Sequence, residues 1–193
     1  MLRMYTLNKT GSIRDWLNFS ISPQEEETIE RMAIKDIDSL CYSFICRYSK
    51  LSENFIERLL ALTTGVLNEK STDEEISKLT DLMVKVKTSE DKSYNPEITL
   101  TSKVTLLKDK TKKKSPDNME VKYESRSYKV RNLPDRLDWV YISRFQQLSN
   151  NFLKKYAKYL SYRDLLAYES LDHDFIVEYG EHFNGYSSKE IKN

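Results

Sequence analysis

Three segments of the chain share one 18-residue pattern and align with one another without gaps. They are YSFICRYSKLSENFIERL (residues 42–59), WVYISRFQQLSNNFLKKY (139–156) and YRDLLAYESLDHDFIVEY (162–179). Each has an aromatic residue, an aliphatic residue three positions later and a second aromatic residue three positions after that. Leu-Ser or Leu-Asp follows, and then a Phe. A gap-free match among three segments indicates an internal repeat, which restricts the fold to stacked copies of one unit.

The repeated unit reads as a pair of short helices. In the second copy Trp139, Ile142 and Phe145 lie three residues apart, so they share one helix face. Ser149 stands where its hydroxyl can cap a following helix by accepting a hydrogen bond from an early amide. Phe152 then starts a second apolar stripe. The pattern therefore predicts two helices that are joined at Leu-Ser.

One such unit cannot bury its aromatic face alone, so the copies are expected to stack on one another. Ser52 and Asp172 occupy the cap position of the first and third copies. We expect the repeated apolar residues to form the core of the stack. These residues are Tyr42, Ile45, Tyr48, Leu51, Phe55, Ile56, Trp139, Ile142, Phe145, Leu148, Phe152, Leu153, Tyr162, Leu165, Tyr168, Leu171, Phe175 and Ile176.

The chain between the first and second copies predicts a helix and then a β-hairpin. Apolar residues recur at helical spacing over 73–86. The segments 97–107 and 119–130 instead alternate with period two, as strands do, although the second alternation slips in a way that a bulge would explain. Residues 1–7 alternate weakly and are a candidate for an N-terminal edge strand. The predicted fold is mainly α, of the α+β class: short stacked αα-hairpin repeats with an inserted two-stranded β-hairpin.

The length of 193 residues fits a single domain. Within residues 1–193 we expect three parts. Residues 1–92 form a helical part with the first repeat, 93–134 form the β-hairpin insertion, and 135–193 hold the other two repeats.

Charge, cysteine content and apolar runs limit the partners and the cellular location that we expect for this chain. A formal net charge of +1 gives the whole protein no preference for nucleic acid or for an anionic membrane. Cys41 and Cys46 lie on a predicted helix and do not resemble a disulfide framework, so we expect reduced thiols. The N-terminus lacks the apolar run of a secretion signal, and no stretch approaches the roughly 20 apolar residues of a membrane span. These features predict a protein inside the cell or in a particle, with no membrane partner.

Patterns that carry catalysis are scarce. The four glycines form no phosphate-binding loop, and neither HExxH nor CxxC occurs. The two histidines, His173 and His182, have Asp172, Asp174 and Glu181 nearby, and such side chains can bind zinc. Their spacing matches no common zinc motif, and surface histidines are the simpler interpretation. We therefore predict no enzyme, no cofactor and no metal; an enzyme with a pocket around these histidines is the alternative.

The strongest electrostatic feature is a basic segment at the predicted hairpin. It could contact phosphates or an acidic protein surface, although a solvated hairpin tip is the alternative interpretation. Its residues are Lys108, Lys110, Lys112, Lys113 and Lys114 in the loop, and Arg126, Lys129 and Arg131 in and after the second strand.

The second copy resembles a short repeat of proteins from bacteriophages and large DNA viruses, with the pattern W-x-x-I-S-x-Y/F-Q-x-L-S-x-x-F-I. The matching residues are Trp139, Ile142, Ser143, Phe145, Gln146, Leu148, Ser149 and Phe152. The first copy departs at Tyr42, Cys46 and Ser49, and the third departs at Tyr162, Leu166 and Glu169. The three copies cover about 54 of 193 residues. The resemblance implies a viral setting and no particular activity.

These observations lead to three functional hypotheses. The first is a non-enzymatic viral interaction protein, in the host cytoplasm or in the virion, that binds a host or viral macromolecule, with a protein as the expected partner; an inhibitor of host defence is one form of it. The second is a nucleic-acid-binding module that uses the lysine-rich loop. The third is a structural virion component. The sequence leaves the partner and the oligomeric state open.

Overall fold

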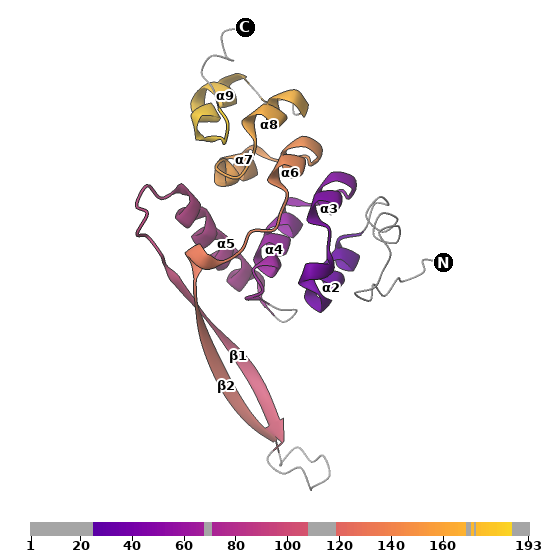
Figure 1. Cartoon of the computed structure of the whole chain (residues 1–193), viewed down its shortest axis with the longest axis vertical. Coiled ribbons are helices and arrows are strands. Elements are labelled where there is room, and N and C mark those ends of the chain that lie inside the picture. The colour runs from indigo at the N-terminus through magenta and orange to yellow at the C-terminus, as the bar shows by residue number, and fades with distance from the viewer. Residues whose placement is uncertain (1–24, 68–70, 108–118, 169–170, 172, 187–193) are drawn as a thin grey trace, which may run out of the picture.

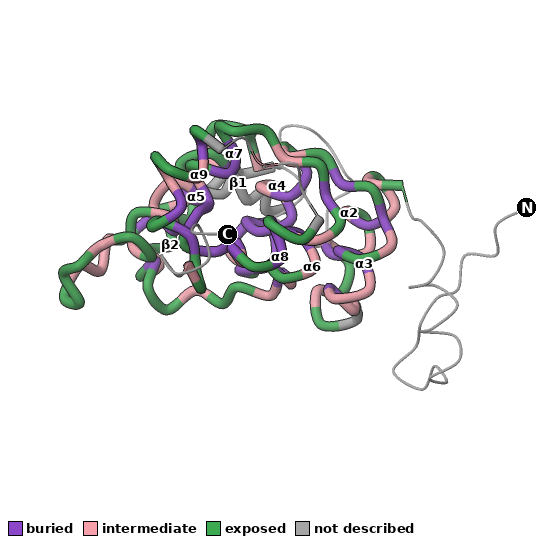
Figure 2. Tube along the Cα trace, turned by 90° about the horizontal axis from the view of Figure 1, so that it is seen from above, coloured by how far each residue is buried: buried purple, intermediate pink, exposed green. Residues whose placement is uncertain are grey.

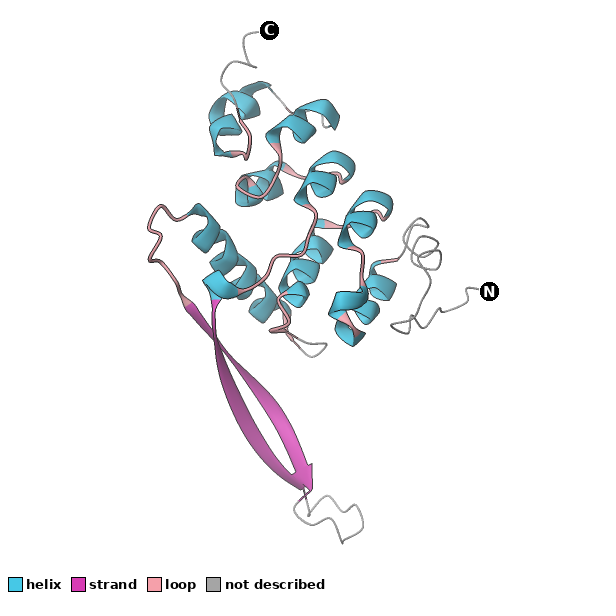
Figure 3. Cartoon of the chain, in the orientation of Figure 1, coloured by secondary structure: helices cyan, strands magenta, loops and turns pink. Residues whose placement is uncertain are grey.

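A computed structural model describes residues 25–67, 71–107, 119–168, 171 and 173–186. It is mainly helical with one two-stranded antiparallel sheet, as the sequence predicts (Figure 3). The elements are α2 (Glu26–Lys35), η1 (Ile37–Ser39), α3 (Tyr42–Tyr48), α4 (Glu53–Thr63), α5 (Asp73–Thr88), β1 (Glu97–Leu107), β2 (Met119–Lys129), η3 (Val130–Asn132), α6 (Trp139–Phe145), α7 (Asn150–Tyr156), α8 (Tyr162–Tyr168), α9 (His173–Tyr179) and η4 (Gly180–His182).

Each repeat copy forms the predicted pair of helices. The copies are α3 with α4, α6 with α7, and α8 with α9, and in each copy the second helix begins at the same repeat position. Ser52 and Ser149 cap their helices by accepting hydrogen bonds from the amides of Phe55 (3.2 Å) and Phe152 (3.3 Å). The predicted cap of the third copy, Asp172, lies outside the described residues.

The copies stack side by side into a short solenoid. α3, α6 and α8 lie in one row, and α4, α7 and α9 lie behind them (Figure 1). The helix α5 packs on α4, so the insertion between the first and second copies does not interrupt the row. Buried residues line the inner sides of the helices, while the outward turns are exposed (Figure 2).

The helix α2 behaves as the second helix of a further copy. Glu26, its first residue, accepts hydrogen bonds from the backbone N–H and the hydroxyl of Ser52. Glu53, the first residue of α4, accepts the same two bonds from Ser149. In both cases a glutamate at the first position of one helix accepts hydrogen bonds from the N-cap serine of the next. The helix α2 is therefore placed relative to α4 as α4 is placed relative to α7.

A second contact between the same pairs of helices repeats in the same register. Glu30 of α2 pairs with Arg58 of α4 at 2.6 Å, and Glu57 of α4 pairs with Lys155 of α7 at 2.9 Å. The sequence carried a signal of this relation, because IERM at 29–32 matches IERL at 56–59. The segment that would hold the first helix of this further copy lies outside the described residues.

Gln146 joins the first two copies across the insertion. Its side-chain amide donates to the carbonyls of Cys46 (2.8 Å) and Ser49 (2.9 Å), and its oxygen accepts from the amide of Leu51 (2.8 Å). The last carbonyls of a helix lack partners within that helix, so this side chain replaces the backbone bonds that α3 loses at its end. Gln146 is itself buried, so all of these bonds lie away from water.

Most of the repeated apolar residues are buried in the core, with one correction. Phe145 was expected in the core but is 42% exposed, because the end of α6 turns it toward solvent. The side chain of Tyr168 is not described. Four expected core residues are half-buried, and the remaining twelve are buried. The half-buried residues are Tyr48, Leu148, Leu171 and Ile176.

Aromatic rings pack closely together in and just after the second copy. The ring of Trp139 lies 5.4 Å from that of Tyr156 and 4.8 Å from that of Tyr159, and Phe152 lies 4.5 Å from Tyr156. The indole N–H of Trp139 donates to Asp135 at 2.7 Å, which satisfies its polar atom.

The two cysteines form no disulfide. Cys46 is buried and Cys41 is half-buried. Burial raises the pKa of the Cys46 thiol to about 12, so this thiol stays protonated and unreactive at neutral pH.

The β-hairpin projects as an arm from the helical body (Figure 1). Its strands pair without a break from Glu97 opposite Lys129 to Leu107 opposite Met119, so the expected bulge is absent from this ladder. Ile98 and Val130 at its base are buried in the main core and anchor the arm there. The expected N-terminal strand at 1–7 lies outside the described residues.

None of the helices in the described ranges combines the length and the apolar composition that a membrane crossing requires.

Replacing Gln146 tests the junction between the first two copies. Gln146→Ala leaves two carbonyls and one amide without partners in a buried place, so the free energy of unfolding should fall by about 2–4 kcal/mol in a urea titration. The matched control is Gln147→Ala, because Gln147 is the exposed neighbour. Its effect should stay within about 0.5 kcal/mol. Equal effects of the two substitutions would contradict the proposed junction.

Candidate functional site

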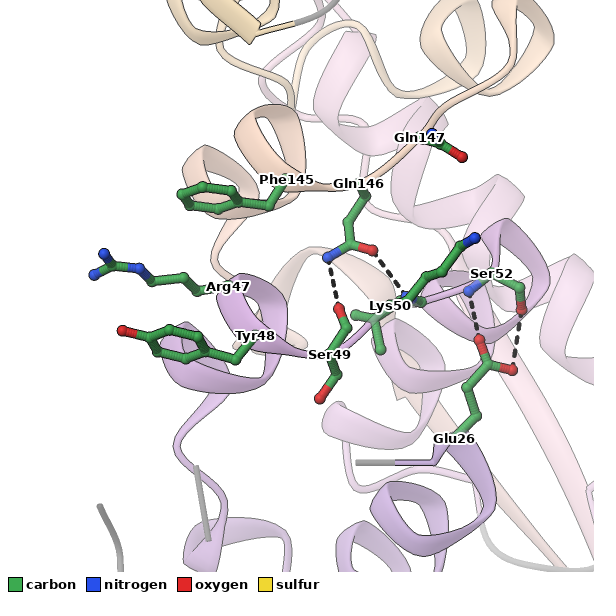
Figure 4. A pocket seen from close by; sticks show the side chains of 10 residues that line it. Glu26, Arg47, Tyr48, Ser49, Lys50, Ser52, Phe145, Gln146 and Gln147 are labelled. Atoms are coloured by element: carbon green, nitrogen blue, oxygen red, sulfur yellow. Dashed lines mark hydrogen bonds between the residues drawn. The ribbon is translucent and has the colours of Figure 1, made fainter. Parts of the chain in front are cut away.

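An open groove lies where the ends of α3 and α6 meet, between the first and second copies (Figure 4). Its volume is about 640 Å³. We call it the Arg47 groove. It is lined by Glu26, Arg47, Tyr48, Ser49, Lys50, Leu51, Ser52, Phe145, Gln146 and Gln147.

The repeat places two aromatic side chains at this groove. Tyr48 and Phe145 hold the same position in the first and second copies, at the last residue of each first helix. Because the helices lie side by side, the two rings lie on either side of the Arg47 side chain (Figure 4). The Arg47 Cζ atom lies 5.0 Å from the Tyr48 ring centre and 5.8 Å from that of Phe145. Such distances allow a cation–π attraction.

The floor of the groove is the Gln146 junction, which is rigid because every polar atom of that side chain is bonded. At the other end, Glu26 bonds to Ser52 through both carboxylate oxygens. Lys50 and Gln147 are exposed on the rim. The groove therefore combines a fixed floor with an aromatic and cationic wall.

A second opening lies one copy further along the same row, lined by Arg144, Arg163, Asp164 and Ala167. Arg144 holds the repeat position of Arg47, and its guanidinium donates to one oxygen of Asp164 at 2.6 and 3.1 Å. Burial alone would raise the pKa of the Asp164 carboxyl, but the hydrogen bonds from Ser161 and Arg144 and the charge of Arg144 outweigh burial and lower it. An internal ion pair thus forms part of the wall of this opening.

The structure describes only part of the predicted basic segment. The five loop lysines, Lys108, Lys110, Lys112, Lys113 and Lys114, lie outside the described residues. Arg126 and Lys129 are exposed on β2, and Arg126 lies 3.6 Å from Glu124.

Arg131 has an internal role instead. It donates to the backbone carbonyls of Tyr94 (3.1 Å) and Asp91 (3.3 Å), and so it holds the segment before β1 against the end of the hairpin. This arginine is therefore a poor candidate for contact with a ligand.

The histidines are not brought together as a described site. His182 is exposed, with Nε2 3.9 Å from Glu181, and the side chain of His173 is not described. Within the described ranges, no group of three or more His, Cys, Asp or Glu side chains is arranged to hold a metal ion.

The sequence interpretation missed the Arg47 groove because it assigned Tyr48 and Phe145 to the core. A signal was present in the aligned repeats: both Arg47 and Arg144 stand immediately before the second aromatic residue. A cation at the same place in two copies, beside an aromatic residue, is a pattern that sequence reasoning can recognise. Which of these arginines is exposed depends on the stacking.

Comparison of the chain with protein-family models, with curated proteins and with solved structures found no significant match.

The ion pair between Arg144 and Asp164 makes stability depend on pH. The pKa of Asp164 is lower in the folded chain than in the unfolded chain, so its contribution is present above about pH 4 and is lost as the pH falls further. At pH 7 Asp164→Asn should lower the free energy of unfolding by about 1–2 kcal/mol.

This difference should shrink when denaturant titrations are repeated at acidic pH. Glu90→Gln, which changes an exposed carboxylate, is the matched control and should have a small effect at either pH. A loss from Asp164→Asn that stays constant down to pH 3 would contradict the role of the ion pair.

Proposed function

We propose that this chain is a non-enzymatic interaction protein of viral type that binds another protein through the Arg47 groove. The observation that carries the proposal is the exposure of Phe145, at 42%, beside Tyr48 and Arg47 on the surface of a repeat scaffold. Tyrosine and arginine are enriched at the centres of protein interfaces. Burial of a large exposed aromatic ring under a partner makes the free energy of binding more favourable. The rigid floor at Gln146 supports the same role, because a fixed surface loses little entropy on binding.

The viral setting of this proposal comes from the resemblance of the second copy to repeats of phage and large-DNA-virus proteins. In that setting the partner is a host or viral protein in the host cytoplasm. Inhibition of a host defence is one form of this function, and assembly into the virion as a structural component is the other.

Two aromatic substitutions test the proposal. A tagged chain captures proteins from infected and uninfected host cells, and mass spectrometry identifies them. The double variant Tyr48→Ala/Phe145→Ala should lose the specific partner, and binding of the purified partner should weaken at least about tenfold, because interface aromatics contribute more than about 1 kcal/mol each.

Val177→Ala is the matched control. Val177 is an apolar side chain on α9, away from the groove, and it is 64% exposed. It should leave the capture unchanged. A partner that binds the double variant and the control equally well would contradict the proposal.

Nucleic-acid binding through the hairpin is the second candidate. Arg126 and Lys129 are exposed on β2, and the arm projects from the helical body, so a long polyanion could reach it (Figure 1). Phosphate contacts release counterions, so such binding would weaken steeply with added salt.

The lysine-rich loop provides the test of this candidate. Replacing Lys110, Lys112, Lys113 and Lys114 with Glu should abolish a gel shift of duplex or single-stranded DNA at low salt. The same gel shift with the double aromatic variant separates the two functions, since that variant should bind DNA normally. A shift that survives the four lysine substitutions would exclude this candidate.

A further inference from the structure

Arg47 carries a charge without a carboxylate partner among the described residues. Its contacts there are aromatic: the ring centres of Tyr48, Tyr141 and Phe145 lie 5.0, 5.7 and 5.8 Å from its Cζ atom. The residue is exposed, so its N–H groups point into a place that a ligand can reach. A guanidinium that is held between rings is already ordered, and so it loses less entropy when it forms a hydrogen-bonded pair.

The next copy shows what an arginine at this repeat position binds. Arg144 reaches across to the neighbouring first helix and pairs with Asp164 at 2.6 Å. The residue at the place of Asp164 in the second copy is Tyr141, whose side chain is a neutral phenol and has no carboxylate to offer. Arg47 therefore extends toward the next copy in the same way as Arg144, but it contacts the aromatic ring of Tyr141, whereas Arg144 contacts a carboxylate.

The rest of the lining leaves the groove with a net positive charge. Lys50 on the rim is exposed. The acid that lines the groove is Glu26, which accepts hydrogen bonds from Ser52 through both oxygens and keeps its negative charge. Because Arg47 and Lys50 outnumber this one carboxylate, the groove attracts a negative group from outside, while Tyr48 and Phe145 offer apolar surface beside the cations.

We infer that the Arg47 groove takes an acidic segment of a partner protein. A carboxylate of that segment pairs with Arg47, as Asp164 pairs with Arg144, and a second acid lies near Lys50. An apolar or aromatic side chain of the segment packs on Phe145 and Tyr48. This inference rests on the proposed protein-binding function and adds the chemistry of the partner.

The test uses the full chain and a fluorescent random copolymer of glutamate and tyrosine, followed by anisotropy. Arg47→Glu should weaken binding of the copolymer at least about tenfold, since it replaces a charge-assisted pair by a repulsion. Arg47→Lys should give an intermediate loss, because an ammonium keeps the charge without the planar fork. Urea titrations of each variant show whether the fold is intact.

Lys158→Glu is the matched control. It makes the same change of charge at an exposed residue just after α7, outside the groove, and it should leave binding nearly unchanged. Equal losses for Arg47→Glu and Lys158→Glu, or no copolymer binding by the wild-type chain, would overturn the inference. Binding of labelled oligo(dT) that depends on Arg47, in place of the copolymer, would assign the groove to nucleic acid and overturn it as well.

The captured partner separates this inference from the proposed function. If capture depends on Tyr48 and Phe145 but not on Arg47, the groove binds a protein without using an acidic segment, so the inference fails and the proposed function stands. If capture depends on none of the three residues, both fail. Capture that depends on all three, with an acidic segment of the partner protected in the complex, supports both.

Discussion

The buried amide of Gln146 is the contact on which the arrangement of the copies depends. It satisfies two carbonyls and one amide at the end of α3, and it does so from a position about a hundred residues further along the chain. An unpaired polar group in such a place is costly, so this side chain permits few other placements of α6 beside α3. α3 and α6 therefore stay in contact although α5 and the hairpin are inserted between them in the sequence. The Arg47 groove lies on this junction and inherits its rigidity.

Repetition lets one set of positions serve both the fold and a surface. The carboxylates of Glu26 and Glu53 accept hydrogen bonds from the N-cap serines of the next helices, so the same contact joins successive helices of the stack. At another position the copies differ: the second arginine meets Asp164, while Arg47 meets Tyr141. One change of residue type within the repeat therefore turns an internal ion pair into an exposed cation. A binding site can arise in this way without any change in the scaffold.

The hairpin contributes differently from the helices. Its base is part of the core through Ile98 and Val130, whereas its strands extend away from it. Arg131, which looks like part of the basic segment in the sequence, is used to fasten the arm through two backbone carbonyls. Charge counted along the chain therefore overstates the charge that the described part of the arm offers to a ligand.

The sequence by itself determined the repeat, the helix caps at Ser52 and Ser149, the two paired strands and the burial of most of the repeated apolar residues, because these depend on local periodicity and on turn chemistry. It also held the match between α2 and α4, which is visible once their contacts are known. The tertiary structure alone decided which aromatic residues are covered. Phe145 lies on the apolar face of its own helix, yet it is exposed, because burial depends on the neighbouring copy. For the same reason the pairing of Arg144 and the exposure of Arg47 became apparent only when the copies were stacked.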